Sequence, residues 1–323
     1  IYIDFFTDKL ITSVLVSNNI TLQEVVFTAK EDKGLTSKSI IDRKAMEHLQ
    51  PSSFSDLMEL LPGGLAKLPN LTKTNVALIR ENSGKPSGYD TSSLGIQFMV
   101  DDNIINSNSD MQRSLNQGAL LGEPGYRNTI STGIDMRSIS TNDIEKVEII
   151  RGIPSAAYGD LTSGLIKIDR KIGVTPLQAR IKADGYSKQY YIGKGFSLKD
   201  NWKLNASVDF LDAKNDPSDD QQNYQRITAS LRSELKLKLW NNPLKWRTNL
   251  DFSGTLDNVS IDPDNAYAPT DTYKSYTRKF TVANNFTYEL PKQSFFNLIT
   301  LNTSVRQGFD RIKQRQFVQY SGP

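Results

Sequence analysis

Apolar and polar side chains alternate with a period of two from about residue 176 to residue 311. The clearest run is ITASLRSELKLKL, residues 227–239. Its two faces are Ile227, Ala229, Leu231, Leu235, Leu237 and Leu239 on one side, and Thr228, Ser230, Arg232, Glu234, Lys236 and Lys238 on the other. Successive side chains of a strand point to opposite faces. The pattern therefore predicts about seven strands of an antiparallel sheet with one apolar and one polar face.

Strand length and loop order distinguish a membrane barrel from a soluble sandwich. Several runs exceed the roughly 5–6 residues of a typical globular strand and reach the roughly 9–11 of a tilted membrane-crossing strand. The connections LKDN, NNP and PKQ are short, whereas KNDPSDDQQNY and residues 258–272 are long and polar, and the two kinds alternate. Membrane barrels have short periplasmic turns and long outer loops, and a sandwich has no reason to sort its loops this way. The sequence thus favours a membrane barrel.

Composition agrees with a barrel that has a wet interior. Only 37% of the residues are hydrophobic, yet the chain holds 14 Phe, 13 Tyr and 3 Trp. Trp202, Trp240 and Trp246 lie near the predicted short-turn end, where an interfacial aromatic girdle is expected. A net charge of +3 is too small to indicate nucleic acid as a partner.

The sequence shows no set of residues that would form a catalytic site. It has no cysteine and one histidine, His48, which excludes thiolate chemistry and argues against a zinc or iron site. It also has no Ser/His/Asp set and no glycine-rich phosphate loop, so we expect neither an enzyme nor a cofactor. The acidic stretch 262–271 reads as an outer loop; a calcium site there is left open, although its spacing is not that of an EF-hand.

Residues 35–170 have a different character. SIIDRKAMEHLQPSSFSDLMELLPGG predicts two short helices, the second capped by Ser52 or Ser53 and ended by Gly63-Gly64. LGIQFMVDDNII predicts a strand, a turn at Asp101-Asp102-Asn103 and a second strand. Residues 106–142 are rich in Asn, Ser, Gly and Thr and read as long loops, which in a compact domain are usually functional. This part is predicted to be a small α+β domain.

Four stretches, in order, resemble the plug of TonB-dependent outer-membrane receptors. They are LQEVVFTAKE (22–31), DLMELLPGG (56–64), IQFMVDDNII (96–105) and IEKVEIIRGIPSAAYGDLTSGLIKI (144–168). The last resembles the closing motif of the plug, and the first resembles the segment that holds the TonB box in Bacteroidetes-type receptors. LIRENSG (78–84) is a loose version of another plug motif, and IIRGIPS differs from the sequence usual in SusC-type glycan importers.

The resemblance implies a domain order and a fold. Residues 1–21 would end a small, carboxypeptidase-regulatory-like β module, 22–34 would be a linker with the TonB box, 35–172 the plug, and 173–323 the first strands of an incomplete barrel. The expected fold class is an α+β plug followed by the N-terminal portion of a large, 22-stranded transmembrane barrel, whose lumen such a plug fills. The run ending near Arg311 would then lack a partner on its far side or pair with chain beyond Pro323. The polar face of the strands would point at residues 35–170 and the apolar face outward; in the clearest run these are Arg232, Glu234, Lys236 and Lys238, and Leu231, Leu235 and Leu237.

The resemblance also implies roles for single residues. The energy-coupling residues would be Glu24, Val25, Val26, Phe27, Thr28 and Ala29, an extended segment suited to adding a strand to TonB. A plug-to-barrel lock would comprise Glu148, Arg151, Gly152, Tyr158 and Gly159, with the Arg151 guanidinium suited to a carboxylate on a lumen-facing strand. Ligand-facing plug loops would present Arg80, Tyr89, Asp90, Asn106, Asn108, Arg113 and Arg127.

These features together predict TonB-dependent, plug-gated import across the outer membrane of a Gram-negative bacterium. The nutrient class is open among siderophore, haem, cobalamin, peptide and oligosaccharide. Partners would be TonB with its inner-membrane motor complex, outer-membrane lipid and a surface lipoprotein. The alternative is a surface β protein, an adhesin or glycan-binding module, that transports nothing.

Overall fold

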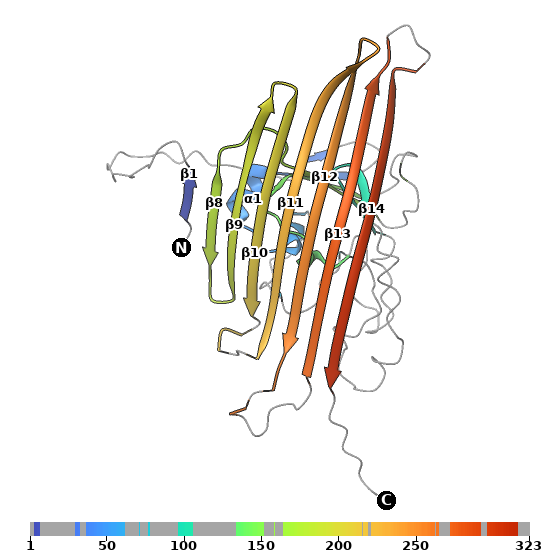
Figure 1. The fold of residues 1–323 in the computed structure, drawn as a ribbon. Helices are drawn as coiled ribbons and strands as arrows, with labels where there is room; N and C mark the ends of the chain where they lie inside the picture. Colours follow the sequence, from blue (N-terminus) through green and yellow to red (C-terminus); the bar gives the residue numbers. More distant parts are fainter. Residues whose placement is uncertain are drawn as a thin grey trace, which may run out of the picture.

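The computed structural model describes residues 3–6, 30–32, 37–61, 71, 77, 96–105, 134–151, 158, 164–214, 216–218, 221–261, 263–264, 272–291 and 296–315. These residues form two sheets, and the smaller one lies behind the larger in Figure 1. Among the helices of the described residues, none is long and apolar enough to cross a membrane.

The larger sheet, the barrel wall, has eight strands in the order β1-β8-β9-β10-β11-β12-β13-β14. The strands are β1 (Ile3–Phe6), β8 (Gln178–Ala183), β9 (Ser187–Lys199), β10 (Trp202–Lys214), β11 (Gln222–Leu239), β12 (Asn242–Val259), β13 (Thr272–Glu289) and β14 (Leu298–Arg315). Every neighbouring pair is antiparallel. The predicted antiparallel strands are confirmed, and β14 pairs only with β13 among the described strands.

The connections of the wall fall at two ends. The turns after β9, β11 and β13 lie at the top of Figure 1, which we call the short-turn end, and the connections after β10 and β12 lie at the long-loop end. The two residues between β11 and β12, Trp240 and Asn241, both have positive φ, as a type I′ hairpin requires. The connections after β9 and β11 span residues 200–201 and 240–241, and those after β10 and β12 span 215–221 and 260–271, so the predicted alternation of short and long holds for these four. The connection after β13 spans 290–297 and is longer than the one after β10, so the prediction of a short turn there is wrong.

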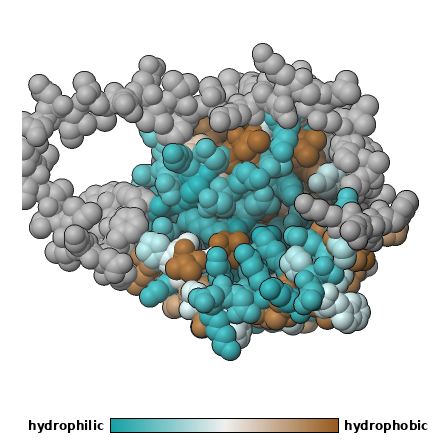
Figure 2. Space-filling model, turned by 90° about the horizontal axis from the view of Figure 1, so that it is seen from above, coloured by the Kyte–Doolittle hydropathy of each residue, from teal (hydrophilic) through white to brown (hydrophobic). Residues whose placement is uncertain are grey.

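The two faces of the wall differ as the alternation predicts. Outward side chains such as Leu231, Leu250 and Phe280 are exposed, whereas inward ones such as Arg232 and Asn249 are buried. Seen from above in Figure 2, hydrophilic residues occupy the middle of the described part, and hydrophobic ones appear above them and at the left and right of the lower margin. A sheet folded around its own apolar core would show the reverse, so the prediction for these faces is confirmed.

The prediction for the short-turn end of β11 holds only in part. Glu234 is buried on the inward face, but its ion pairs are to Arg247 and Lys245 of the neighbouring strand rather than to the smaller sheet. Lys236 and Lys238 share that face and are exposed. They lie close to the turn, where the described part of the smaller sheet does not cover the strand (Figure 1).

The smaller sheet, which with its helices we call the plug, has six strands in the order β2-β3-β6-β7-β4-β5. The strands are β2 (Lys30–Asp32), β3 (Ser37–Asp42), β4 (Ile96–Val100), β5 (Asn103–Ile105), β6 (Ile144–Arg151) and β7 (Gly164–Arg170). The helices are α1 (Arg43–Leu49) and α2 (Phe54–Leu57), with 3₁₀ turns η1 (Met58–Leu60) and η4 (Met136–Ser138). The sheet is mixed, because β4 and β7 run parallel.

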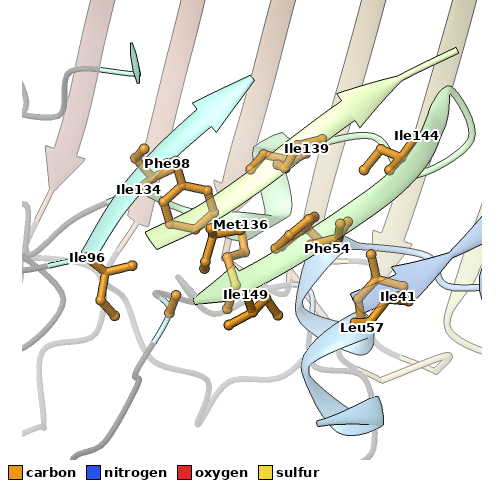
Figure 3. Packing of buried hydrophobic residues seen from close by; sticks show 14 of the residues in the cluster. Ile41, Phe54, Leu57, Ile96, Phe98, Ile134, Met136, Ile139, Ile144 and Ile149 are labelled. Atoms are coloured by element: carbon orange, nitrogen blue, oxygen red, sulfur yellow. The ribbon is translucent and has the colours of Figure 1, made fainter. Parts of the chain in front are cut away.

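Helices and sheet of the plug share one apolar core. Phe54 and Leu57 of α2 pack with Phe98 of β4 and Ile149 of β6 (Figure 3). Ser53 caps α2 in a capping box with Asp56, one of the two caps predicted for this helix. His48 lies exposed on α1, as expected. Asp101 and Asp102 form the predicted turn, both with positive φ.

The segment that joins β7 to β8 crosses the inward face of the wall. The Gly195 amide donates to the Thr175 carbonyl at 3.1 Å, and a Cβ on Gly195 would collide with the carbonyl oxygen of Gly173 and with Thr175. Gly173 itself has φ +109°, in the region that favours glycine. Glycine at 195 is therefore what allows the connection to lie directly on the β9 backbone.

The predicted domain boundaries stay predictions. Of residues 1–21, the described part is β1, which pairs with β8 at the edge of the wall. Of the linker 22–34, the described part is β2, which pairs with β3. Gly63-Gly64, residues 106–133 and most of the acidic stretch 262–271 lie outside the described residues.

Candidate functional site at the plug–barrel interface

Five charged side chains meet between the plug and the wall, and we call them the Asp143 cluster: Asp101, Asp143 and Arg170 of the plug, and Arg232 and Asp251 of the wall. The Arg232 guanidinium lies 3.1 Å from Asp101, 3.4 Å from Asp143 and 2.8 Å from Asp251. Arg170 contacts Asp251 at 2.8 Å and Asp143 at 3.5 Å. The cluster is therefore a continuous network in which each of the two arginines contacts carboxylates of both domains.

Local structure explains how the plug presents these side chains. Asp101 lies in the turn between β4 and β5, Asp143 just before β6, and Arg170 at the end of β7. The Arg170 amide donates to the Asp101 carboxylate at 2.9 Å, which fixes the turn against β7. The three side chains therefore gather where β4 and β7 end and β6 begins, at one end of these strands, where they meet β11 and β12.

Asp143 and Arg232 are buried, the other three side chains are partly buried, and the cluster carries a net negative charge. Three carboxylates and two guanidinium groups sum to −1, and the Arg232 side chain is 1% exposed. Burial raises the pKa of Asp143, but the charges of Arg170 and Arg232 outweigh it, so this pKa lies below its usual value. Asp143 is therefore held ionised, and removal of either arginine would leave an under-compensated charge away from water.

A second contact lies nearer the long-loop end, around Arg226. Arg226 of β11 is fully buried, pairs with Asp209 of β10 at 2.8 Å, and donates to the carbonyls of Arg137 at 2.8 Å and Ile139 at 3.1 Å. These carbonyls are at the end of η4, where backbone acceptors lack partners within the helix. Asn142 also donates to Asp209, at 2.7 Å. The wall thus binds the backbone of the plug as well as its charges.

Arg137 of the plug makes the third contact. Its guanidinium pairs with Asp135 at 2.8 Å, reaches Asp257 of β12 at 3.4 Å, and lies 4.3 Å from the ring centre of Tyr224 on β11. Burial lowers the pKa of Arg137, but the neighbouring Asp135 carboxylate raises it, and the net result is a raised pKa. A buried guanidinium flanked by carboxylates and an aromatic face is fixed in position.

Two further contacts extend the interface across the wall. Lys182 of β8 donates to the Gln50 carbonyl at 2.6 Å and to the Ser52 hydroxyl at 2.7 Å, at the end of α1. On the other side, Asn103 of β5 donates to Asn285 of β13 at 3.0 Å. Polar contacts therefore join the plug to the wall from β8 to β13.

A cavity of about 100 Å³ borders the Asp143 cluster. Three buried side chains of its lining, Ser140, Asp143 and Asn249, each have a polar atom with no hydrogen-bond partner among the described residues. A polar space of this size takes a few water molecules. Water would then complete the hydrogen bonds of the interface.

The predicted lock residues lie elsewhere in the plug. Glu148 pairs with Lys38 at 2.8 Å and with Lys146 at 2.7 Å. Burial raises the pKa of Glu148, but the two cations outweigh burial, so this pKa lies below its usual value. Arg151 donates to Ser39 at 2.6 Å. These contacts are all within the plug. Tyr158 lies near Lys167, and Gly152 and Gly159 are outside the described residues. A lock role for this set stays a prediction.

The remaining predicted site residues are also outside the described part of the chain. They are the coupling residues from Glu24 to Ala29 and the ligand-facing residues Arg80, Tyr89, Asp90, Asn106, Asn108, Arg113 and Arg127. The sequence pattern does not indicate the interface residues Asp101, Asp143 and Arg170; it predicts Asp101 only as a turn residue. One signal was available: Arg232, on the polar face of an otherwise alternating strand, was expected to face the plug.

The comparisons with known proteins bear on this arrangement. Residues 30–165 match the family model of the TonB-dependent Receptor Plug Domain. No curated protein matches the sequence. Solved structures similar to the chain include the ferripyoverdine receptor of the outer membrane of Pseudomonas aeruginosa, with 14% identity, a TM-score of 0.48, and coverage of 90% of this chain and 44% of that one.

Two further similar structures come from other bacteria. The siderophore receptor PirA from Acinetobacter baumannii has 15% identity and a TM-score of 0.42, with coverage of 85% of this chain and 48% of that one. The alcaligin outer-membrane receptor FauA from Bordetella pertussis has 13% identity and a TM-score of 0.45, with coverage of 87% and 47%. The chain spans less than half the length of these three structures.

The family match is to the plug alone, over residues 30–165. TonB-dependent receptors are transporters rather than enzymes, and they lie in the outer membrane of Gram-negative bacteria. Two features stay predictions: the likeness of residues 22–31 to Bacteroidetes-type receptors, and the distinction of this chain from SusC-type importers. Residues 30–165 therefore match the plug domain of TonB-dependent receptors, and the antiparallel strands β8 to β14 follow them in the chain.

Proposed function

We propose that this protein imports a nutrient across the outer membrane by TonB-driven displacement of its plug. The observation that carries the proposal is the Asp143 cluster, in which buried and partly buried charges of the plug meet those of the wall. The nutrient would be a siderophore, haem, cobalamin, a peptide or an oligosaccharide.

A charged interface suits a plug that must move. Burial of a charge carries a desolvation penalty that its partner offsets, so a buried ion-pair network contributes little net stability. When the plug is displaced into a wet lumen, Asp143 and Arg232 regain water and that penalty is relieved. An apolar interface of similar area would lose its stabilisation without such compensation. The network therefore fixes the position of the plug while it leaves displacement accessible to a pulling force.

Energy coupling would enter through the segment LQEVVFTA, residues 22–29. Its extended, β-prone sequence is suited to adding a strand to a partner sheet through main-chain hydrogen bonds. By family resemblance the partner is TonB with its inner-membrane motor complex. Proline at position 26 would remove a backbone donor that such a strand needs.

The test uses the full-length protein in its own outer membrane. Cells that lack the gene are complemented with wild type or with Val26→Pro, and uptake of labelled ferric siderophores, haem, cobalamin, peptides and oligosaccharides is measured. Lys33→Pro, beyond the coupling segment, is the matched control. We expect uptake of one nutrient class with wild type and the control, and none with Val26→Pro, while binding of that nutrient to cells persists.

Two results would contradict the proposal. Equal uptake by Val26→Pro would refute the coupling role of this segment. If no nutrient depends on the gene and the protein washes from cells without detergent, the alternative of a non-transporting surface β protein would hold instead.

A further inference from the structure

Two spaces lie one after the other between the plug and strands β11 and β12. One is the cavity of about 100 Å³ that borders the Asp143 cluster, and the other is a cleft of about 680 Å³. On β12 the lining of the cavity extends from Asn249 to Ser253, whereas the lining of the cleft holds Arg247 and Asn249. Because β12 begins at the short-turn end, the cleft lies nearer that end. The two spaces therefore follow each other along about 20 Å of the inward face, at about 3.3 Å per residue.

The Asp143 cluster forms the partition between these spaces. Two of its members, Asp101 and Arg170, line both of them. Asp143 and Asp251 line the cavity, and Arg232 lines the cleft. Arg232 contacts both residues of the cavity side, Asp143 at 3.4 Å and Asp251 at 2.8 Å. The side chains of one ion-pair network therefore stand between the two spaces.

The contacts across this partition join the plug to the wall through side chains. Arg232 of the wall reaches Asp101 and Asp143 of the plug, and Arg170 of the plug reaches Asp251 of the wall. The bond from the Arg170 amide to Asp101 lies within the plug and moves with it. A shift of the plug away from β11 and β12 therefore parts the ion pairs and joins the two spaces.

A different part of the wall holds the plug through the main chain. We call residues 171–177, which join β7 to β8, the strap. The Thr175 carbonyl accepts a hydrogen bond from the Gly195 amide of β9 at 3.1 Å, and the Thr175 hydroxyl accepts one from Asn205 of β10 at 3.3 Å. These bonds and the covalent connection keep the plug beside β9 and β10. A pull on the plug therefore separates it from β11 and β12 more readily than from β9.

The groups along this route determine which solutes can follow it. Twelve of the fourteen residues that line the cleft are charged. At the partition, Asp143 Oδ1, Asn249 Nδ2 and Arg170 Nε are buried without a hydrogen-bond partner among the described residues. An apolar solute would remove water from such groups at a cost, whereas a hydrated solute supplies hydrogen bonds in return. The route therefore suits hydrophilic solutes.

We propose that the space between the plug and strands β11 and β12 is a passage for hydrophilic solutes, and that the Asp143 cluster is its gate. Arg232 holds the gate closed, because it contacts all three carboxylates of the cluster, whereas Arg170 contacts the side chains of two. That the imported nutrient takes this passage rests on the proposed function. Opening of the gate can be measured without TonB and without the nutrient.

The test measures the conductance of the full-length receptor in planar lipid bilayers, with potassium chloride as the hydrophilic probe. Arg232→Ala removes the side chain that closes the gate, and Arg170→Ala removes the other guanidinium of the partition. The matched control is Arg226→Ala. Arg226 is also a buried arginine of β11 that binds the plug, but it lines neither space. Insertion of each variant is checked by the electrophoretic shift of the unheated, folded barrel.

We expect the open fraction of single-channel records to rise at least about tenfold in Arg232→Ala, because loss of one partner of a buried ion-pair network shifts a two-state gate by this factor or more. Arg170→Ala should open the gate to a smaller extent, and it decides the outcome if Arg232→Ala does not insert. Arg226→Ala should stay as closed as wild type. The passage is refuted if neither gate variant conducts more than wild type. Equal opening by Arg226→Ala would also overturn it, since it would show a plug that is loosened everywhere.

Gating and import can be told apart. If the gate variants conduct but no nutrient depends on the gene, the passage stands and the import function fails. If uptake depends on the gene but both gate variants stay closed, import stands and the passage fails.

Discussion

Arg232 of the wall and Asp143 of the plug lie with Nη1 and Oδ2 3.4 Å apart, although 89 residues separate them in the chain. Both side chains are buried, and both contact other members of the same network. This pair joins the moving part of the proposed transporter to its fixed part. Its properties can be tested by substitution.

Loss of Arg232 should destabilise the plug in the barrel. In Arg232→Met the network keeps three carboxylates and one guanidinium, so its net charge changes from −1 to −2. Removal of one partner of a buried ion pair typically costs about 3–5 kcal/mol. We expect a loss of this order in the free energy of unfolding, measured by denaturant unfolding of the full-length protein in detergent.

A second substitution should restore part of that loss. Asp143→Asn in the Arg232→Met background returns the net charge to −1, so the double variant should lose less stability than the sum of the two single variants, by about 0.5–3 kcal/mol. Lys238→Met, at the exposed end of the same strand, should stay within about 0.5 kcal/mol of wild type. Strict additivity would show that the two groups do not interact.

The pH dependence of stability should report on Lys171. Burial, and the nearby Arg43 and Arg180, lower its pKa from 10.5 to about 8. Between these values the unfolded chain binds a proton that the folded protein has lost, so this group makes the stability rise as the pH rises from about 8 to 10.5. Below about pH 8 both states are protonated and the folded state holds an unfavourable charge.

Lys171→Met removes this contribution. The stability of the variant relative to wild type should therefore be greatest near pH 7 and decline towards pH 10. The measurement is denaturant unfolding of both proteins at several pH values between 7 and 10. A stability difference that does not change with pH would contradict the lowered pKa of Lys171.

Gly195 should not tolerate a side chain. A Cβ there would collide with the Gly173 carbonyl and Thr175, so Gly195→Ala must displace the connection between plug and wall. Overpacking of this kind typically costs about 1–3 kcal/mol. Gly308→Ala is the matched control, because the nearest atom to a Cβ at that position is 3.8 Å away, on the flexible side chain of Lys279. If the melting temperatures of both variants are equal, the close approach at Gly195 is unimportant.

Cross-linking the plug to the wall should block uptake. The side chains of Asn103 and Asn285 are hydrogen-bonded at 3.0 Å, and the sequence has no cysteine that would interfere. In Asn103→Cys/Asn285→Cys, a short, cleavable bis-thiol reagent should stop transport of the nutrient, and cleavage should restore it. Each single variant, treated in the same way, should transport normally. Undiminished uptake by the cross-linked protein would mean that this edge of the plug does not move.

The sequence by itself determined the elements of the wall and the side of each strand that faces lipid. Alternation has a strict period of two, so Leu231 and Arg232 must point to opposite faces whatever lies around them. Local chemistry likewise determined the cap at Ser53 and the turn at Asp101-Asp102, because a cap or a two-residue turn depends on a few adjacent residues. The order of the plug motifs was sufficient to indicate the family.

Tertiary structure alone decided which charges meet. The family resemblance implies a lock role for Glu148 and Arg151, which stays a prediction; in the plug sheet Lys38 and Lys146 lie beside Glu148, and Ser39 lies beside Arg151. Asp143 and Arg170, which flank the closing motif, meet Arg232 and Asp251 of the wall. Ion pairs between domains depend on the relative placement of two sheets, and that placement results from many long-range packing contacts that no local pattern encodes.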